Sequence, residues 1–271
     1  MRLLALGIII NGIWGCQDSS DGKATNRHPN IQSDTLAFSD TTIKKFSPYF
    51  VETDEGIDTT IAQVTFPEFE DETMNKIIVS NMLLEGETDV DQFLDNFLEA
   101  YGNFVEENDI QYPLVWTKNT RIDVGFHTPQ LIVIKNTTYE FSGGAHGNSF
   151  QLWNLYDLGS YRKLPFNTFI PDNKRQAFTK VAETYFRLHE GLDDTTNLET
   201  SYFFEDGVFS LPENFGVSKS GLEFHYNPYE IKPYVAGSTT FTVPTSAINE
   251  FLTETGKDYF KHIHNYFNST P

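Results

Sequence analysis

The chain has 271 residues, with 19 Lys and Arg against 38 Asp and Glu, which gives a formal net charge of −19. Aromatic residues make up 15% of it, so the chain has material for a core and is not a disordered acidic tail. This charge argues against nucleic acid and against electrostatic adsorption to anionic lipid, because both need a basic face, and it favours a basic partner. A single cysteine excludes an intrachain disulfide and a cysteine-based zinc site.

The first 16 residues have the anatomy of a secretory signal. They read MRLLALGIIINGIWGC, with one arginine, an apolar stretch too short to span a bilayer comfortably, and a small residue before Cys16. The segment resembles a bacterial lipoprotein signal peptide, which predicts that Cys16 is the lipid attachment site. We expect residues 17–44 to be a flexible polar tether and the folded part to lie outside the cytoplasm, facing the periplasm or at the cell surface. An uncleaved membrane anchor or a buried first helix is the alternative.

The first half of the folded region predicts strands, then helices, then strands. Two strands are expected at residues 49–53 and 57–66 around a turn, with Pro67 ending the second. Helices are predicted within 70–86 and over 88–106, the latter from a wide apolar stripe. Three or four antiparallel strands are expected in residues 112–158, with breaks at 118–119, 127–129 and 143–147.

The second half repeats this grouping. Asp172 is predicted to cap a helix that runs to about Leu188, with one face formed by Ala177, Val181, Tyr185 and Leu188. Strands are expected across 214–243 with a turn at 219–221, followed by a helical segment over 245–267 that breaks near Gly256. Because strands and helices come in runs, we predict an α+β fold with antiparallel sheets and packed helices.

Charge is unevenly distributed along the chain. Residues 77–117 contain no Lys or Arg and nine acids, several of them on the polar face of the second predicted helix. Such a face is either a solvated surface or an acidic docking surface for a cationic partner, and the sequence leaves both open. The candidate binding residues here are Asp91, Asp95, Glu99 and Glu106.

A glycine-rich string at residues 139–147 is the most unusual motif. One interpretation takes His146 as a general base with glycine amides as an oxyanion hole. The other is a tight turn whose histidine caps neighbouring backbone, which we favour because the chain has no G-x-S-x-G nucleophile motif. None of the seven histidines has zinc-site spacing, so we predict no metal and no cofactor. A glycan receptor built on Trp116 and Trp153 is a third interpretation, although both residues suit a core or a half-buried strand.

Two separated signatures resemble a known family. YEFSGGAHGNSFQLWNLYDL, at residues 139–158, is followed by a short basic turn and LPFNTFI, and resembles the junction of a PdaC-type domain with an RsiV-type domain. Residues 215–248 are similar to the C-terminal signature of the same family. There the strings at 227–231 (NPYEI) and 234–237 (YVAG) stand where the family has its Pro-Tyr-Glu and Tyr-Ala-x-Gly elements. Val235 replaces the usual alanine, and the segment 190–213 is lengthened and acidic.

The resemblance implies an extracytoplasmic domain of a bacterial envelope protein, with a PdaC-like region at 45–150 and an RsiV-like region at 151–271. In the anti-sigma factor that names the family this region binds lysozyme, and in the deacetylase it accompanies a separate catalytic domain. We therefore expect a lipid-anchored, non-enzymatic protein that binds a basic protein such as lysozyme, or peptidoglycan, with His146 and Tyr229 added to the acidic candidates. The alternative is an envelope hydrolase or peptidoglycan-modifying enzyme that uses His146.

Overall fold

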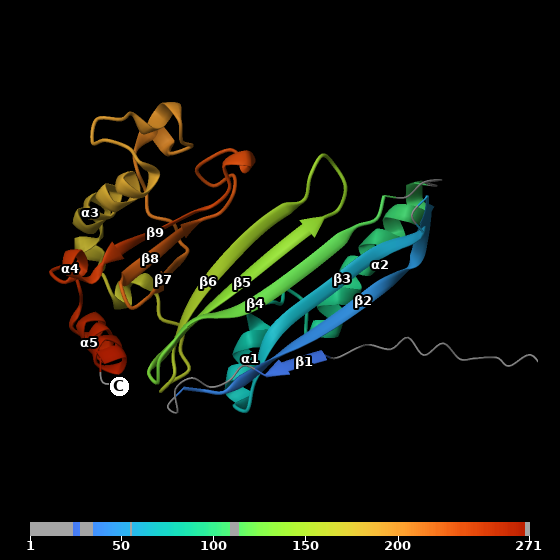
Figure 1. Cartoon of the computed structure of the whole chain (residues 1–271), viewed down its shortest axis with the longest axis horizontal. Helices are drawn as coiled ribbons and strands as arrows, with labels where there is room; N and C mark the ends of the chain where they lie inside the picture. Colours follow the sequence, from blue (N-terminus) through green and yellow to red (C-terminus); the bar gives the residue numbers. More distant parts are fainter. Residues whose placement is uncertain (1–23, 28–34, 55, 109–113, 269–271) are drawn as a thin grey trace, which may run out of the picture.

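Two β-sheets form the frame of the protein (Figure 1). The computed structural model describes residues 24–27, 35–54, 56–108 and 114–268, so the predicted signal and Cys16 lie outside the described residues. The larger sheet has six strands in the order β1-β2-β3-β4-β5-β6. Its strands are β1 (Ala24–Arg27), β2 (Phe38–Thr53), β3 (Gly56–Phe69), β4 (Thr117–His127), β5 (Leu131–Phe141) and β6 (Asn148–Asp157).

Helices α1 (Glu72–Ser80) and α2 (Val90–Asn108) connect β3 to β4 and cover one face of this sheet. The crossover makes β3 and β4 parallel, while the other neighbouring strands pair antiparallel. The Asp71 carboxylate caps α1 by accepting a hydrogen bond from the Met74 amide at 2.9 Å. The apolar stripe of α2 is buried as predicted, through Phe93, Leu94, Phe97 and Tyr101.

The C-terminal part packs on the other face of the large sheet. It contains α3 (Asp172–Glu190), α4 (Thr245–Ile248), α5 (Glu254–Asn268) and a three-stranded antiparallel sheet of β7 (Phe215–Val217), β8 (Gly221–Tyr226) and β9 (Thr239–Pro244). Single 3₁₀ turns lie at η1 (Phe166–Thr168), η2 (Leu198–Thr200), η3 (Glu205–Gly207) and η4 (Tyr234–Ala236).

Strand β5 belongs to both hydrophobic cores. Its residues alternate between the two sheet faces, so Ile132 and Ile134 pack under α1 and α2 while Leu131 and Val133 pack against the C-terminal part. All four are buried. The predicted boundary between residues 150 and 151 falls inside β6, the neighbour of this shared strand.

The close approach of the two sheets requires a glycine in β7. A Cβ on Gly216 would lie 3.0 Å from the ring of Trp153 on β6 and 3.5 Å from Val133 on β5. Ordinary packing needs more room than this, so only glycine lets β7 lie against the large sheet without displacing Trp153.

The lengthened acidic segment 190–213 is packed against the core and held at its start by Glu190. The Glu190 carboxylate accepts hydrogen bonds from Lys232 Nζ at 3.0 Å, the Tyr202 hydroxyl at 2.8 Å and the Thr239 hydroxyl at 2.9 Å. The side chains of Glu190 and Lys232 are only 13% and 15% exposed, so this ion pair is mostly removed from water.

The α+β fold with antiparallel sheets is confirmed, with β3 and β4 as the parallel exception. Several predicted boundaries are wrong. Residues 38–44, assigned to the tether, form the start of β2, and Ala24–Arg27 pairs with that strand as β1. Pro67 lies inside β3. Strand β4 pairs with β3 only up to Thr65, so on that side no strand needs a hydrogen bond from the backbone nitrogen of residue 67, and proline is tolerated. The predicted break at 118–119 lies inside β4.

The helices of the C-terminal part also differ from the prediction. Asp172 is the first residue of α3 rather than its cap, since Pro171 occupies the cap position. The buried face of α3 is made by Phe178, Ala182 and Phe186, one residue along from the predicted stripe, and Leu188 is 73% exposed. The break between α4 and α5 lies at residues 249–253, because Gly256 is inside α5 and buried against Phe169.

Candidate functional site

The predicted site residues fall into two separate regions. Asp91, Asp95, Glu99 and Glu106 lie on α2, which covers one face of the large sheet. His146 lies in the loop between β5 and β6, and Tyr229 in the loop between β8 and β9. The structure therefore brings together the four acids, and separately the histidine with the tyrosine.

Helix α2 is positioned by its own N-terminal residues. Asp89 caps it, because its carboxylate accepts the Gln92 amide at 2.9 Å and its carbonyl accepts the Phe93 amide. The hydrogen bond from the Gln92 amide, helped by that from the Thr88 hydroxyl, lowers the pKa of Asp89. With its apolar stripe held against the sheet, the polar face of α2 has to point outward.

Lys45 of β2 forms ion pairs with two of the acidic residues on this face. Its Nζ lies 2.8 Å from Asp91 and 2.9 Å from Asp95, one turn apart on the helix. Burial lowers the pKa of Lys45, but hydrogen bonds to both carboxylates outweigh this and leave it raised. Asp91 and Asp95 thus share Lys45 in an ion pair on the surface, while Glu99 is exposed one turn further on without such a partner among the described residues.

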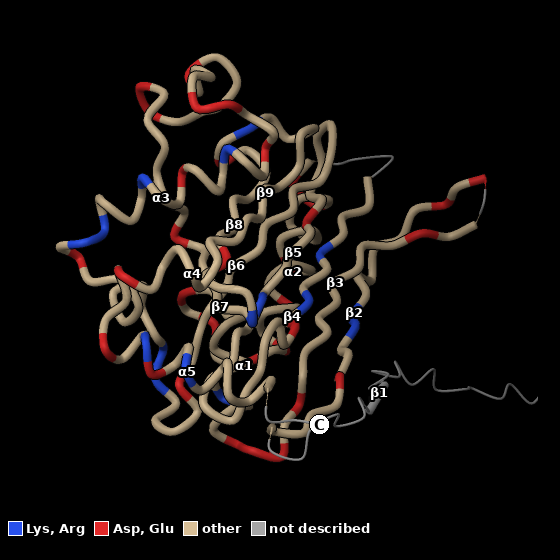
Figure 2. The backbone as a smooth tube through the Cα atoms, turned by 60° about the vertical axis from the view of Figure 1, so that its left-hand side comes forward, with Lys and Arg blue, Asp and Glu red and all other residues tan. Residues whose placement is uncertain are grey.

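The hairpin of β2 and β3 projects beyond the body of the protein and carries acidic residues near its tip (Figure 2). The Tyr49 hydroxyl of β2 donates to the Glu106 carboxylate near the end of α2. The hairpin itself exposes three large apolar side chains, Phe46 at 55%, Phe50 at 58% and Ile57 at 72%. We use the name helix–hairpin surface for the exposed polar face of α2 together with the exposed part of the hairpin, residues 46–57.

His146 is part of a small aromatic cluster that joins the two halves of the chain. Its ring stacks on Tyr234 with centroids 4.2 Å apart, and its Nε2 lies 3.2 Å from the Tyr229 hydroxyl. Its Nδ1 lies 2.8 Å from the carbonyl oxygen of Gly147. The polar partners of His146 are thus a backbone carbonyl and a phenol, which fits the predicted role of a histidine that caps a turn.

Local backbone geometry fixes this cluster. The ring of Tyr139 lies against Gly147, so a Cβ at position 147 would have to displace that ring. Tyr229 has a φ of 68°, in the left-handed region that few non-glycine residues adopt, and its amide donates to the Lys232 carbonyl. Such a conformation persists only where surrounding contacts hold it, and it orients the Tyr229 ring toward His146.

The edge of β6 is closed by two asparagine side chains instead of a further strand. Asn227 accepts the Gln151 amide at 2.6 Å and donates to the Gln151 carbonyl at 3.0 Å. Asn214 donates to the same carbonyl at 2.7 Å and accepts the Trp153 amide at 3.1 Å. The first residue of the NPYEI string therefore anchors the loop of Tyr229 to the large sheet.

Sequence reasoning missed Lys45 and Tyr234 as neighbours of the candidate residues. Tyr234 stands in the second quoted signature, and this could have drawn attention to it. Lys45 is separated from its acidic partners by about half of the first region, and no sequence signal links it to them. Trp116 and Trp153 are packing residues, since Trp116 contacts the rings of Phe97, Tyr101 and Phe104 and Trp153 is 6% exposed.

Within the described ranges, no group of three or more His, Cys, Asp or Glu side chains is arranged to hold a metal ion. In the same part of the chain, the helices are all too short or too polar to cross a membrane.

Comparison with known proteins identifies both halves of the chain. Residues 48–149 match the family described as deacetylase PdaC, and residues 167–246 match the family described as a protein of unknown function, DUF3298. The chain therefore combines a PdaC-like N-terminal part with a DUF3298 or RsiV-like C-terminal part, as the two signatures predicted. These families indicate an extracytoplasmic domain of the cell envelope.

Solved structures share the fold. A DUF3298-family protein from Bacteroides fragilis superposes with a TM-score of 0.67 at 18% identity, covering 86% of this chain and 99% of that one. A DUF3298-family protein from Pseudomonas aeruginosa gives a TM-score of 0.61 at 18% identity, covering 79% and 94%.

Curated relatives are similar over a shorter stretch. The immunogenic proteins MPB64 of Mycobacterium bovis and MPT64 of Mycobacterium tuberculosis are 30% identical over 125 residues, which is 45% of this chain. The match spans about half of their length, 52%.

Proposed function

We propose that this chain is a lipid-anchored, non-enzymatic protein of the bacterial cell envelope that binds a basic protein of the lysozyme type through the helix–hairpin surface. The observation that carries the proposal is the exposed acidic face of α2, where, among the described residues, Lys45 alone forms ion pairs, with Asp91 and Asp95 near the start of the helix. Glu99 and Glu106 are exposed on that face. A cationic partner would be steered to it and anionic ones repelled.

The hairpin adds exposed apolar side chains, which a partner can bury, to the charged face of α2. Stable interfaces place large apolar anchors at their centre and charged groups at the rim. Phe46, Phe50 and Ile57 are more than half exposed on the hairpin whose Lys45 and Tyr49 contact the acidic helix. Phe46 follows Lys45 and points to the opposite face of the strand, so a partner has to wrap around the hairpin to use these side chains as anchors together with the acids of α2. The resemblance to a lysozyme-binding domain supports the same class of partner.

Calorimetric titration of the purified chain with lysozyme, at low and at physiological salt, tests this proposal. We expect binding that weakens as salt rises, because exposed charges more than about 8 Å apart are screened at physiological ionic strength. Absence of binding at both salt concentrations would remove lysozyme as the partner. Binding that is insensitive to salt would remove the acidic face as the cause.

Three single variants locate the surface. Glu99→Gln should weaken binding, and Lys45→Gln should strengthen it, since the latter frees the carboxylates of Asp91 and Asp95 for the partner. Glu205→Gln is the matched control, because it makes the same charge change at an exposed position in η3, in the C-terminal part. Equal effects of Glu99→Gln and Glu205→Gln would mean that only net charge matters.

Lipid anchoring and the absence of catalysis need their own tests. Cys16→Ser should move the protein from the membrane fraction to the soluble fraction, and mass spectrometry should find an acylated N-terminal cysteine in the unmodified chain. Incubation with purified peptidoglycan should release no sugar or peptide. Release that His146→Ala abolishes without lowering the melting temperature would contradict the non-enzymatic role.

A further inference from the structure

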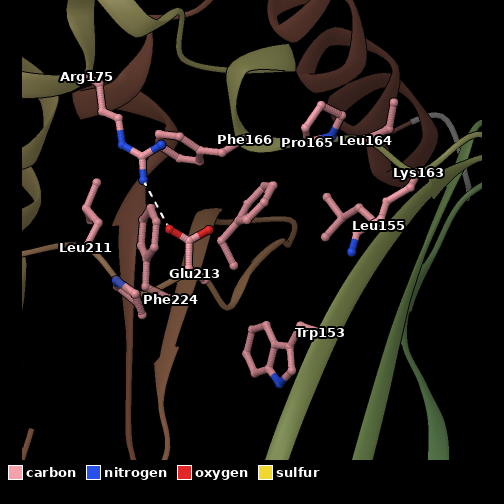
Figure 3. A pocket seen from close by; sticks show the side chains of 12 residues that line it. Trp153, Leu155, Lys163, Leu164, Pro165, Phe166, Arg175, Leu211, Glu213 and Phe224 are labelled. Atoms are coloured by element: carbon pink, nitrogen blue, oxygen red, sulfur yellow. Dashed lines mark ion pairs between the residues drawn. The ribbon is translucent and has the colours of Figure 1, made fainter. Parts of the chain in front are cut away.

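A cavity lies between strand β6 of the large sheet and the C-terminal part, and it is lined by other residues than the two regions described above. Its volume is about 230 Å³. It is bordered by β6, the basic turn and LPF string that follow it, the start of α3, and the segment before β7. The lining residues are Trp153, Leu155, Lys163, Leu164, Pro165, Phe166, Arg175, Leu211, Pro212, Glu213, Phe215 and Phe224 (Figure 3).

The floor of this cavity is made of fixed apolar side chains. Trp153, Leu155, Phe215 and Phe224 are buried in the core. Phe166 packs edge-on against Phe215 with centroids 5.2 Å apart. These side chains are already held by their neighbours, so the cavity is preformed and an apolar group entering it would order little that is not ordered already.

Two cations border the same cavity. Lys163 and Arg175 reach it from opposite sides, as Figure 3 shows. The Arg175 guanidinium lies 5.2 Å from the centroid of Phe166, and its Nη2 is 3.7 Å from the Glu213 carboxylate, beyond hydrogen-bond distance. Among the described residues no carboxylate lies within ion-pair distance of Lys163, and Glu213 is 97% exposed. The rim of this cavity therefore carries two positive charges against the one exposed carboxylate of Glu213, in a chain that has twice as many acids as bases.

We propose that this cavity binds a small organic carboxylate with an apolar chain or ring. The carboxylate would bind Arg175, with Lys163 attracting it from the opposite side, and the apolar body would lie against Phe166 and Leu211, the half-buried apolar side chains of the lining. At about 30 Å³ for a water-sized group, the volume accommodates roughly eight such groups, which matches a medium-chain fatty acid. Arginine presents paired donors in the geometry that a carboxylate accepts.

Glu213 occupies the place of the ligand's carboxylate in the unliganded protein. Its distance from Arg175 and its exposure mean that releasing it into water costs little. A bound carboxylate would therefore displace Glu213 from Arg175, and removing the charge of Glu213 should favour the ligand.

Isothermal titration calorimetry of the full chain with octanoate, and with octan-1-ol as the uncharged counterpart, tests the proposal. We expect octanoate to bind about tenfold more tightly than the alcohol, as a charge-assisted hydrogen bond in a partly buried site implies. Equal affinity for both would overturn recognition of the anion. No heat with either ligand would overturn the site altogether.

Charge variants then place the ligand in this cavity. Arg175→Gln and Lys163→Gln should each weaken octanoate binding several-fold to tenfold and leave octan-1-ol unaffected, whereas Glu213→Gln should strengthen octanoate binding. Lys180→Gln is the control, because it removes one positive charge from an exposed position of α3 outside the cavity. An unchanged octanoate affinity in both the Arg175 and Lys163 variants, with melting temperatures like that of the parent, would refute the assignment.

Discussion

His127 is expected to make the stability of this protein depend on pH. It is the last residue of β4, opposite Ile132, on the face covered by α1 and α2. Its Nε2 accepts the Leu36 amide at 3.4 Å, which requires an unprotonated nitrogen. Burial lowers the pKa of His127 from 6.5 to about 4.

The sign and size of the effect follow from these two values. Between pH 6.5 and about 4 the unfolded chain protonates this histidine while the folded protein does not, so protons favour unfolding. The contribution of neutral His127 to the free energy of unfolding is complete above pH 6.5 and is lost as the pH falls through about 4. At about 1.4 kcal/mol per pKa unit, the gap corresponds to about 3 kcal/mol, and partial exposure of the ring reduces this to about 1–3 kcal/mol.

Urea denaturation followed by circular dichroism, at several values between pH 7.5 and 4.5, measures the free energy of unfolding. His127→Gln keeps an acceptor for the Leu36 amide but cannot titrate, so the difference between parent and variant should shrink or reverse toward low pH. His262→Gln makes the same change at an exposed position of α5 and should leave the pH dependence unaltered. If the parent and His127→Gln curves stay parallel over the whole range, the reasoning is wrong.

Two further variants probe the contacts between the large sheet and the C-terminal part, and a third probes an ion pair within the C-terminal part. Gly216→Val should destabilise the protein by about 1–3 kcal/mol, since its side chain would overlap Trp153; an unchanged melting temperature would show that the sheets separate easily. Asn227→Ala should cost about 1–3 kcal/mol in urea denaturation, because the Gln151 amide loses its acceptor, and a neutral result would mean that water replaces it. Glu190→Gln should cost about 1–3 kcal/mol by leaving its partly buried lysine without an ion partner, whereas an unchanged stability would indicate that the lysine reaches solvent.

Features with a local cause could be predicted from the sequence. The stripe of α2 repeats at helical spacing, and its buried side chains are the predicted ones. The turn at 219–221 also lies where predicted, because Gly221 has a φ of 155° and a Cβ there would meet the Val243 carbonyl oxygen.

Features that depend on residues far apart in the sequence could not be predicted from it. Helix α3 carries two apolar rows one residue apart, and only the neighbouring sheet decides that Phe178 and Phe186 face inward while Leu188 does not. The parallel pairing of β3 with β4 follows from where α1 and α2 dock. The contact of His146 with Tyr229 joins residues 83 positions apart, and no local pattern encodes it.

The structure changes how the net charge of −19 has to be interpreted. As an average it favours cationic partners, and the helix–hairpin surface agrees with that expectation. Charges act over about 8 Å at physiological salt, however, so a site responds to its own neighbours and not to the total. Around the cavity those neighbours are Lys163, Arg175 and one exposed glutamate. The two proposals are therefore compatible in one acidic protein, with a cationic partner proposed for α2 and a small anion for the cavity beside α3 on the other side of the sheet.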